Sequence, residues 1–243
     1  DILVKKDGRW HAYEVKSSTH VKDTHFVDGS IQYYVIAGSG IDIKSFSMVT
    51  INKEYVRKGD IVVEDLFNKT DITDEVCDLQ SGLSERISEL KAVEQLNSEP
   101  EVEIGPHCGS PYPCDFSGYC WKGIPAYSVL NLNNSRGKEW ELYDRGILDI
   151  TDIPDDFHLN DKQRIQVDAA LLNEPQIKKE AIQQFLNTLD YPLYHFDFET
   201  INSAVPLYDQ SRPYQQIPFQ YSLHVQSSKA ASPIHTSFLA EGN

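Results

Sequence analysis

Residues 1–16 have the sequence DILVKKDGRWHAYEVK, two short segments of alternating character on either side of Asp7-Gly8. An Asp-Gly dipeptide between such segments is typical of a two-residue β-hairpin turn. With this turn, paired residues have numbers that sum to 15, so Asp1 lies opposite Glu14. Directly opposed residues on antiparallel strands have Cβ atoms roughly 4.5–5.5 Å apart. The hairpin therefore places two carboxylates close together, where they repel each other unless a cation lies between them.

Lys16 adds a positive charge to this pair. It comes two residues after Glu14 and therefore projects from the same face of the strand. Two carboxylates and a lysine that converge on one sheet surface are groups suited to metal-assisted hydrolysis. We therefore predict a hydrolytic site on this hairpin.

The rest of the chain alternates between helical and strand patterns. The pattern predicts a helix over 24–36 that ends at Gly38-Ser39-Gly40, a strand over 41–51, and a partner strand with loops over 52–75. Apolar residues at steps of three and four predict a helix over 75–96. Further helices are expected over 161–172 and 176–189, and strands from 191 and over 217–225.

Composition limits the class of protein. The chain has 243 residues, 40% of them hydrophobic, which is enough for one large or two ordinary cores. The net charge of −15 argues against nucleic-acid binding by bulk electrostatics alone. An enzyme that acts on nucleic acid stays possible, because carboxylates that bind divalent metals count as negative until the metal is bound.

The apolar runs, the cysteines and the ends of the sequence indicate where the protein is located and whether it is a fragment. The sequence has neither a run of about 18 apolar residues nor a signal-peptide pattern, so we expect no membrane partner. Four cysteines, three of them clustered, do not resemble a secreted disulfide scaffold, and we expect a cytoplasmic location. Because the chain starts with Asp1 and ends in a polar stretch, we expect it to be a fragment of a longer protein.

The hairpin resembles the active site of the PD-(D/E)XK nucleases, and in particular their RecB-like branch. The matching residues are Asp1, Glu14-Val15-Lys16 and the downstream Gln32-Tyr33-Tyr34. The resemblance implies that Asp1 and Glu14 bind Mg²⁺ or Mn²⁺. It implies that Lys16 positions the attacking water or stabilises charge on the phosphate, and that Gln32 supports the site.

Two details of this match remain open. The branch often has a tyrosine four residues after the glutamine, where this chain has Ile36. His25 and Asp28 lie on the same predicted helix as Gln32, and we expect both to be surface or supporting groups and not metal ligands.

A loop rich in Cys, Pro and Gly follows over 105–125. Its three cysteines, Cys108, Cys114 and Cys120, are evenly spaced, and thiolates bind soft or borderline metals, so we predict metal or cluster ligation. Zinc is one possibility, with His107 or Cys77 completing a tetrahedral set, and three unliganded buried cysteines are another. The resemblance to RecB-like nucleases with a four-iron cluster implies a [4Fe-4S] cluster whose fourth cysteine precedes Asp1.

The segment His195-Phe-Asp-Phe-Glu-Thr200 alternates strictly. Phe196 and Phe198 are expected in a core, with Asp197 and Glu199 on the opposite face. This D-x-E resembles the first motif of DEDD, or DnaQ-like, exonucleases, whose fold is RNase H-like, and implies that Asp197 and Glu199 form half of a second metal site. The text of 212–225 resembles an uncharacterised prokaryotic family that joins a RecB-like nuclease, a cysteine loop and a DnaQ-like domain.

Together these observations predict an α/β (α+β) chain with three parts. They are a partial restriction-endonuclease-like core with its cysteine loop (1–125), a helical connector (126–190), and the first strands of an RNase H-like domain (191–243). The expected function is metal-dependent hydrolysis of DNA, as an exonuclease in DNA repair or defence, with RNA as an open alternative substrate. The other readings are a non-catalytic nucleic-acid-binding or scaffold module held by a zinc or iron–sulfur site, and a zinc-stabilised enzyme unrelated to nucleic acid.

Overall fold

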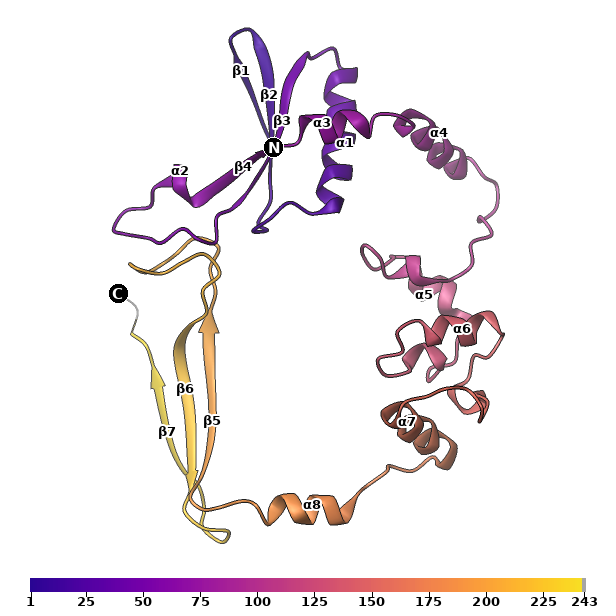
Figure 1. Cartoon of the computed structure of the whole chain (residues 1–243), viewed down its shortest axis with the longest axis vertical. Coiled ribbons are helices and arrows are strands. Elements are labelled where there is room, and N and C mark those ends of the chain that lie inside the picture. Colours follow the sequence, from indigo (N-terminus) through magenta and orange to yellow (C-terminus); the bar gives the residue numbers. More distant parts are fainter. Residues whose placement is uncertain (242–243) are drawn as a thin grey trace. The chain divides into compact units, whose positions relative to one another are not determined.

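The computed structural model describes residues 1–241 and contains both helices and sheets, which confirms the predicted mixed α+β class (Figure 1). The chain forms two compact units. One contains residues 1–98 together with 190–243, and the other contains residues 99–189. None of the helices in the described part of the chain combines the length and apolar character needed to cross a membrane.

The first sheet has the strand order β1-β2-β3-β4, from β1 (Ile2–Lys6), β2 (Arg9–Val15), β3 (Ile43–Ile51) and β4 (Phe67–Asp71). The predicted hairpin is confirmed, since β1 and β2 are antiparallel and their partners run from Ile2↔Tyr13 to Lys6↔Arg9. Asp7 (φ 51°) and Gly8 (φ 79°) both have positive φ, as a type I′ turn requires.

Helix α1 (Asp23–Gly38) connects β2 to β3, which pair in parallel. A parallel pair needs such a crossover, and the helix covers one face of the sheet. The core between helix and sheet contains Ala12 of β2 and Phe46 and Met48 of β3. It also contains Ile72, which directly precedes α3 (Thr73–Asp78), and Val76 of α3. At Gly29 the backbone of α1 lies against Phe46, Ile72 and Val76, so that even a Cβ would be tightly packed against them.

The prediction of one helix over 75–96 is wrong. The segment forms two helices, α3 and α4 (Leu83–Glu94), separated by a turn in which Gly82 has a φ of +83°. Helix α4 has no buried residue, so its apolar spacing is not matched by a packing partner among the described residues. Cys77 lies near the end of α3. The short helix α2 (Val63–Leu66) precedes β4.

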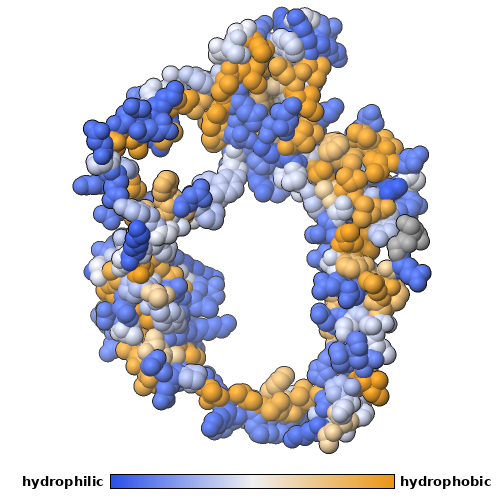
Figure 2. Space-filling model, turned by 180° about the vertical axis from the view of Figure 1, so that it is seen from behind, coloured by the Kyte–Doolittle hydropathy of each residue, from blue (hydrophilic) through white to orange (hydrophobic). Residues whose placement is uncertain are grey.

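The second sheet consists of β5 (Leu193–Ile201), β6 (Ile217–Gln226) and β7 (Ile234–Leu239), all antiparallel. The prediction that Phe196 and Phe198 enter a core is wrong, because they are 57% and 51% exposed. They form an aromatic face with Tyr221 and Phe238. The centroids of neighbouring rings on this face lie 5.6–5.7 Å apart. Within the described residues no second layer covers this face, and hydrophobic surface is visible over the sheet (orange in Figure 2).

The unit of residues 99–189 is helical. The centre of its hydrophobic core is formed by the fully or almost fully buried residues Val129, Leu142, Ile150 and Val167. The predicted helix over 161–172 is confirmed as α7, whereas the helix predicted over 176–189 is shorter. The elements are η1 (Pro106–Cys108), α5 (Ser117–Cys120), η2 (Trp121–Gly123), η3 (Val129–Asn131), α6 (Lys138–Asp144), η4 (Ile150–Asp152), α7 (Asp161–Leu172) and α8 (Lys179–Leu186).

Candidate active site

The predicted site lies at the carboxyl end of β2, on the face that α1 covers. Glu14 shares this face with the core residue Ala12 and is only 7% exposed. Lys16 follows the end of the strand, and its Nζ donates to Glu14 Oε1 at 2.6 Å and to Asp28 Oδ2 at 2.5 Å. One ammonium group therefore lies between two carboxylates that come from a strand and a helix.

Helix α1 supplies two residues to this site. Asp28 and Gln32 are one turn apart, and Gln32 Nε2 donates to Asp28 Oδ1 at 3.2 Å. Gln32 therefore lies in the predicted site, beside Asp28 and Glu14. The sequence predicts a surface or supporting place for Asp28, and in the structure Asp28 is in direct contact with Lys16. The spacing of four residues between Asp28 and Gln32 is the sequence feature that indicates that both side chains lie on one face of the helix.

Asp1 lies next to Glu14, as the hairpin register requires. Its α-amino group is 3.3 Å from Glu14 Oε2, and its carboxylate accepts a hydrogen bond from Val15 N at 2.9 Å. Asp1 directly precedes β1, so its α-amino group faces Glu14 and its carboxylate lies beside the backbone of Val15. We name the set of Asp1, Glu14, Lys16, Asp28 and Gln32 the hairpin site.

The charge state of the hairpin site follows from its contacts. Burial alone would raise the pKa of Glu14, but the hydrogen bonds from Lys16, Gln32 and the α-amino group outweigh burial and hold it below its ordinary value. The pKa of Asp28 is likewise lowered, because Lys16 and Gln32 outweigh burial. The pKa of Lys16 is raised, since Asp28 and Glu14 outweigh its burial. At neutral pH Glu14 and Asp28 are ionised and Lys16 is protonated.

His25 is buried at the start of α1 and has a structural contact. Its Nδ1 accepts a hydrogen bond from the backbone N–H of Lys22 at 3.1 Å, which satisfies a donor at the helix N-terminus. Burial, and then the positive charges of Lys16 and Lys22, lower the pKa of His25 below its ordinary value of 6.5. This contact requires a neutral imidazole ring whose Nδ1 carries no proton and can accept the hydrogen bond.

We predict that these groups make the fold sensitive to acid. The unfolded chain binds more protons than the folded chain at His25 below pH about 6.5, and at Glu14 and Asp28 as the pH falls further, so stability declines as the pH falls. The urea midpoint measured between pH 8 and pH 4 should therefore decrease. In His25→Asn the upper part of this decline should flatten, whereas the same change at the exposed His158 should leave it intact. An unchanged curve in His25→Asn would contradict this assignment.

The three loop cysteines lie in the helical unit. Cys108 and Cys114 are partly buried and Cys120 is exposed, and Cys114 N donates to Cys108 O at 2.8 Å. Cys108 lines an open pocket of about 540 Å³ with Trp121 and Trp140. The indole Nε1 of Trp121 is buried and has no hydrogen-bond partner among the described residues. His107 is exposed and its ring lies close to Gly105, while Cys77 belongs to the other unit, near Tyr33.

Asp197 and Glu199 lie on the polar face of the second sheet. Asp197 is paired with Ser222 and Glu199 with Gln220, and Asp197 Oδ1 accepts from the backbone N–H of Phe198 at 3.0 Å. Both side chains are exposed. The alternation that the sequence predicted is present, and the assignment of this pair to a second metal site stays a prediction.

Metal binding remains a prediction for all of these groups. Across residues 1–241, no three or more His, Cys, Asp or Glu side chains are grouped so that they would hold a metal ion. The hairpin site nevertheless offers hard carboxylate oxygens from Asp1 and Glu14 at one end of the hairpin, and the loop offers soft thiols.

Comparison with known proteins identifies a relationship for the end of the chain. Residues 194–243, the last 50 of the 243, match a family described as a domain of unknown function (DUF2779). No curated protein and no solved structure matches the chain.

Proposed function

We propose that this chain is a metal-dependent nuclease of RecB-like type that hydrolyses DNA phosphodiester bonds at the hairpin site. The observation that carries the proposal is the position of Lys16 between Glu14 and Asp28, beside Asp1. An ordinary solvated pair on a sheet surface would account for E-x-K alone. It does not account for Glu14, which is only 7% exposed and is paired with Lys16 and with the α-amino group of Asp1, because burial of a charge is costly unless the charge is paired.

The donor set fits Mg²⁺ or Mn²⁺. Magnesium prefers oxygen ligands and is commonly held by one or two carboxylates, with water and substrate phosphate completing its coordination. In this proposal Asp1 and Glu14 hold the ion. When bound, it polarises the phosphodiester and lowers the pKa of a coordinated water.

Lys16 supplies positive charge to the phosphate. Because its pKa is raised, it stays protonated at neutral pH and acts as an electrostatic group and not as a general base. Asp28 and Gln32 hold its ammonium group in place through the chain of contacts from Gln32 to Asp28 to Lys16. In this proposal α1 positions Lys16, which directly follows β2.

The loop cysteines and the carboxylate pair of β5 are proposed to bind further metal groups. Cys108, Cys114 and Cys120 would hold a structural [4Fe-4S] cluster, with Zn²⁺ as the alternative. The unpartnered indole N–H of Trp121 beside Cys108 supports a sulfur ligand set, since hydrogen bonds to cluster sulfurs are a recurrent feature of such sites. Asp197 and Glu199 would be half of a second metal site of DnaQ-like type.

The first test is the cation dependence of the 243-residue chain. End-labelled linear DNA should be cleaved with Mg²⁺ or Mn²⁺, because the carboxylates of Asp1 and Glu14 need a hard cation to engage a phosphate. Addition of a chelator should abolish cleavage, and gel analysis of the products measures both results. Cleavage that persists with the chelator would contradict the proposal. DNA binding with no cleavage under either cation would favour the non-catalytic binding module, and cleavage of RNA alone would change the substrate class.

A further inference from the structure

We infer that the loop between β5 and β6, residues 202–216, holds the segment that follows Lys16, and that Tyr214 and Arg57 are positioning residues of the hairpin site. The inference rests on the proposed function for its catalytic consequence. The mechanical part, that the loop orders the segment, stands on the contacts alone. These contacts join residues that are about 150–200 positions apart in the sequence and lie in one compact unit.

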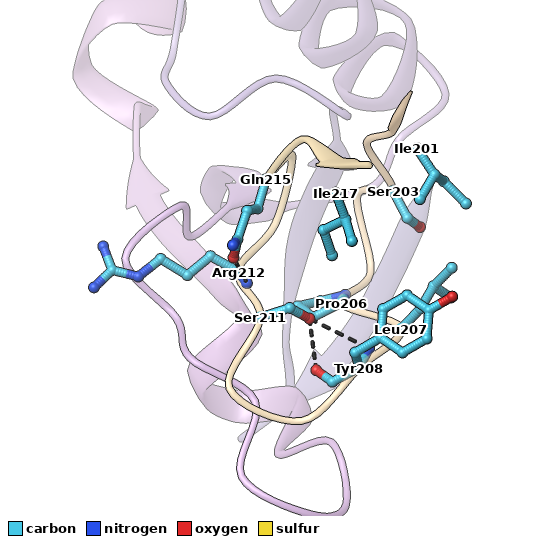
Figure 3. A pocket seen from close by; sticks show the side chains of 9 residues that line it. All are labelled: Ile201, Ser203, Pro206, Leu207, Tyr208, Ser211, Arg212, Gln215 and Ile217. Atoms are coloured by element: carbon cyan, nitrogen blue, oxygen red, sulfur yellow. Dashed lines mark hydrogen bonds between the residues drawn. The ribbon is translucent and has the colours of Figure 1, made fainter. Parts of the chain in front are cut away.

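The loop has a defined internal structure (Figure 3). Ser211 is 4% exposed, and its Oγ donates to the carbonyl of Tyr208 at 2.5 Å and accepts from the Tyr208 N–H at 3.3 Å. The side chain of Gln215 accepts from Arg212 N at 3.0 Å, and Tyr214 N donates to the carbonyl of Ser203 at 2.8 Å. The loop is therefore a folded element that can transmit a constraint.

Two residues of the loop have backbone conformations that side chains rarely adopt. Gln210 has a φ of 62° and Tyr214 a φ of 57°. For a residue with a bulky side chain such a conformation is unfavourable and persists only where surrounding contacts impose it. Both residues contact the region of the first sheet: Gln210 N donates to Arg57 O, and the Tyr214 hydroxyl donates to Ser17 O.

Arg57 lies in the segment after β3 and binds the loop through its guanidinium. Its Nη1 donates to the carbonyls of Pro206 at 3.1 Å and Leu207 at 2.7 Å, while its Nε donates to Gly59 O at 2.8 Å. A forked, always charged donor suits several carbonyls at once, which a lysine cannot reproduce. Backbone bonds add to this contact: Arg57 N to Ser211 O at 3.0 Å, Gln210 N to Arg57 O at 2.8 Å, and Gly59 N to Asp209 Oδ1 at 2.7 Å.

Tyr214 carries the contact to the hairpin site. Its hydroxyl donates to the carbonyl of Ser17, the residue directly after Lys16. On the other side, β3 holds the same stretch, since Lys16 N donates to Val49 O at 2.8 Å and Ile51 N donates to Ser18 O at 2.9 Å. The backbone at Lys16–Ser18 is thus fixed by β3 and by Tyr214.

The segment fixed in this way connects the two halves of the hairpin site. Residues 17–22 join Lys16 at the end of β2 to α1, which carries Asp28 and Gln32. A shift of this connection moves the ammonium group relative to its carboxylate partners. The loop of the second sheet therefore acts on Lys16 through the backbone, without touching the reacting groups.

The test compares Tyr214→Phe with Tyr208→Phe in the 243-residue chain. The two changes are chemically identical and lie in the same loop, but the Tyr208 hydroxyl has no hydrogen bond among the described residues. Hydrogen–deuterium exchange of the amides of Lys16 and Ile51, which donate to Val49 O and Ser18 O, should become about five to ten times faster in Tyr214→Phe, the effect of one lost hydrogen bond, and stay unchanged in Tyr208→Phe. Arg57→Lys should give the same increase, while Arg212→Lys should not.

Cleavage kinetics give the second readout. Tyr214→Phe should lower kcat about tenfold with an unchanged KM, because a misplaced catalytic group slows the chemical step without weakening DNA binding. Unchanged exchange in both Tyr214→Phe and Arg57→Lys would overturn the inference, even if the wild-type chain is a nuclease. Faster exchange with unchanged kcat would overturn the positioning role. If the wild-type chain does not cleave DNA, the proposed function fails, and the exchange comparison still decides whether the loop holds the segment.

Discussion

Cleavage of linear DNA by Lys16→Met should fall by at least about 100-fold, the loss typical when a preorganised group that stabilises transition-state charge is removed. The Nζ of Lys16 lies 2.6 Å from Glu14 Oε1 and 2.5 Å from Asp28 Oδ2, and it is the side-chain ammonium group of the hairpin site. Glu14→Gln should cause a loss of similar size, because the carboxylate proposed to hold the metal becomes neutral. Initial rates under saturating Mg²⁺ measure both losses. Lys53→Met is the matched control, since Lys53 is exposed and its one ion pair among residues 1–241 is with Glu54 at 3.9 Å.

A double variant separates a catalytic role for Lys16 from a structural one. Lys16→Met leaves the carboxylates of Glu14 and Asp28 without their shared cation, so the urea midpoint should also fall. Lys16→Met/Asp28→Asn removes one of these charges and should recover part of the stability but none of the cleavage. Recovery of cleavage in the double variant would show that Lys16 serves the fold alone. Wild-type rates in the single variant would contradict the assignment of the hairpin site.

The hairpin of β1 and β2 could be predicted from the sequence because its signals are local. Asp7-Gly8 specifies the turn, the turn specifies the register, and the register brings Asp1 next to Glu14. Lys16 follows from the two-residue period of a strand. Each of these steps depends on residues within one hairpin, so no knowledge of tertiary packing was needed.

The contacts of the helix and of the loop depend on tertiary packing and were not accessible in the same way. That Asp28 reaches Lys16 depends on how α1 rotates and slides over the sheet, which its own pattern does not specify. The contact between Tyr214 and Ser17 joins two elements with no shared local signal. The exposure of Phe196 and Phe198 shows the same limit, because strand alternation gives the two faces but not which face is covered.

Gly29 shows how packing sets the position of α1, and its replacement is the second large effect that we expect. A Cβ at this position would lie 3.2 Å from Val76 Cγ1, 3.3 Å from Phe46 Cε1 and 3.4 Å from Ile72 Cδ1. Phe46 and Ile72 are 1% exposed and Val76 is fully buried, so these neighbours have little room to move. Gly29 directly follows Asp28, so any displacement of the helix at this point also moves the carboxylate that holds Lys16.

Gly29→Val should therefore destabilise the protein by about 1–3 kcal/mol, the usual cost of overpacking a filled core, and should also reduce cleavage. Urea unfolding measures the first effect and initial rates under folding conditions measure the second. Gly38→Val is the matched control on the same helix, because a Cβ at Gly38 meets no atom within 4 Å. Equal stability losses in the two variants would mean that helix propensity, and not the close approach of α1 to the sheet, accounts for the effect. A loss confined to Gly29→Val, accompanied by slower cleavage, would show that the packing of α1 on Phe46 and Val76 determines the geometry of the hairpin site.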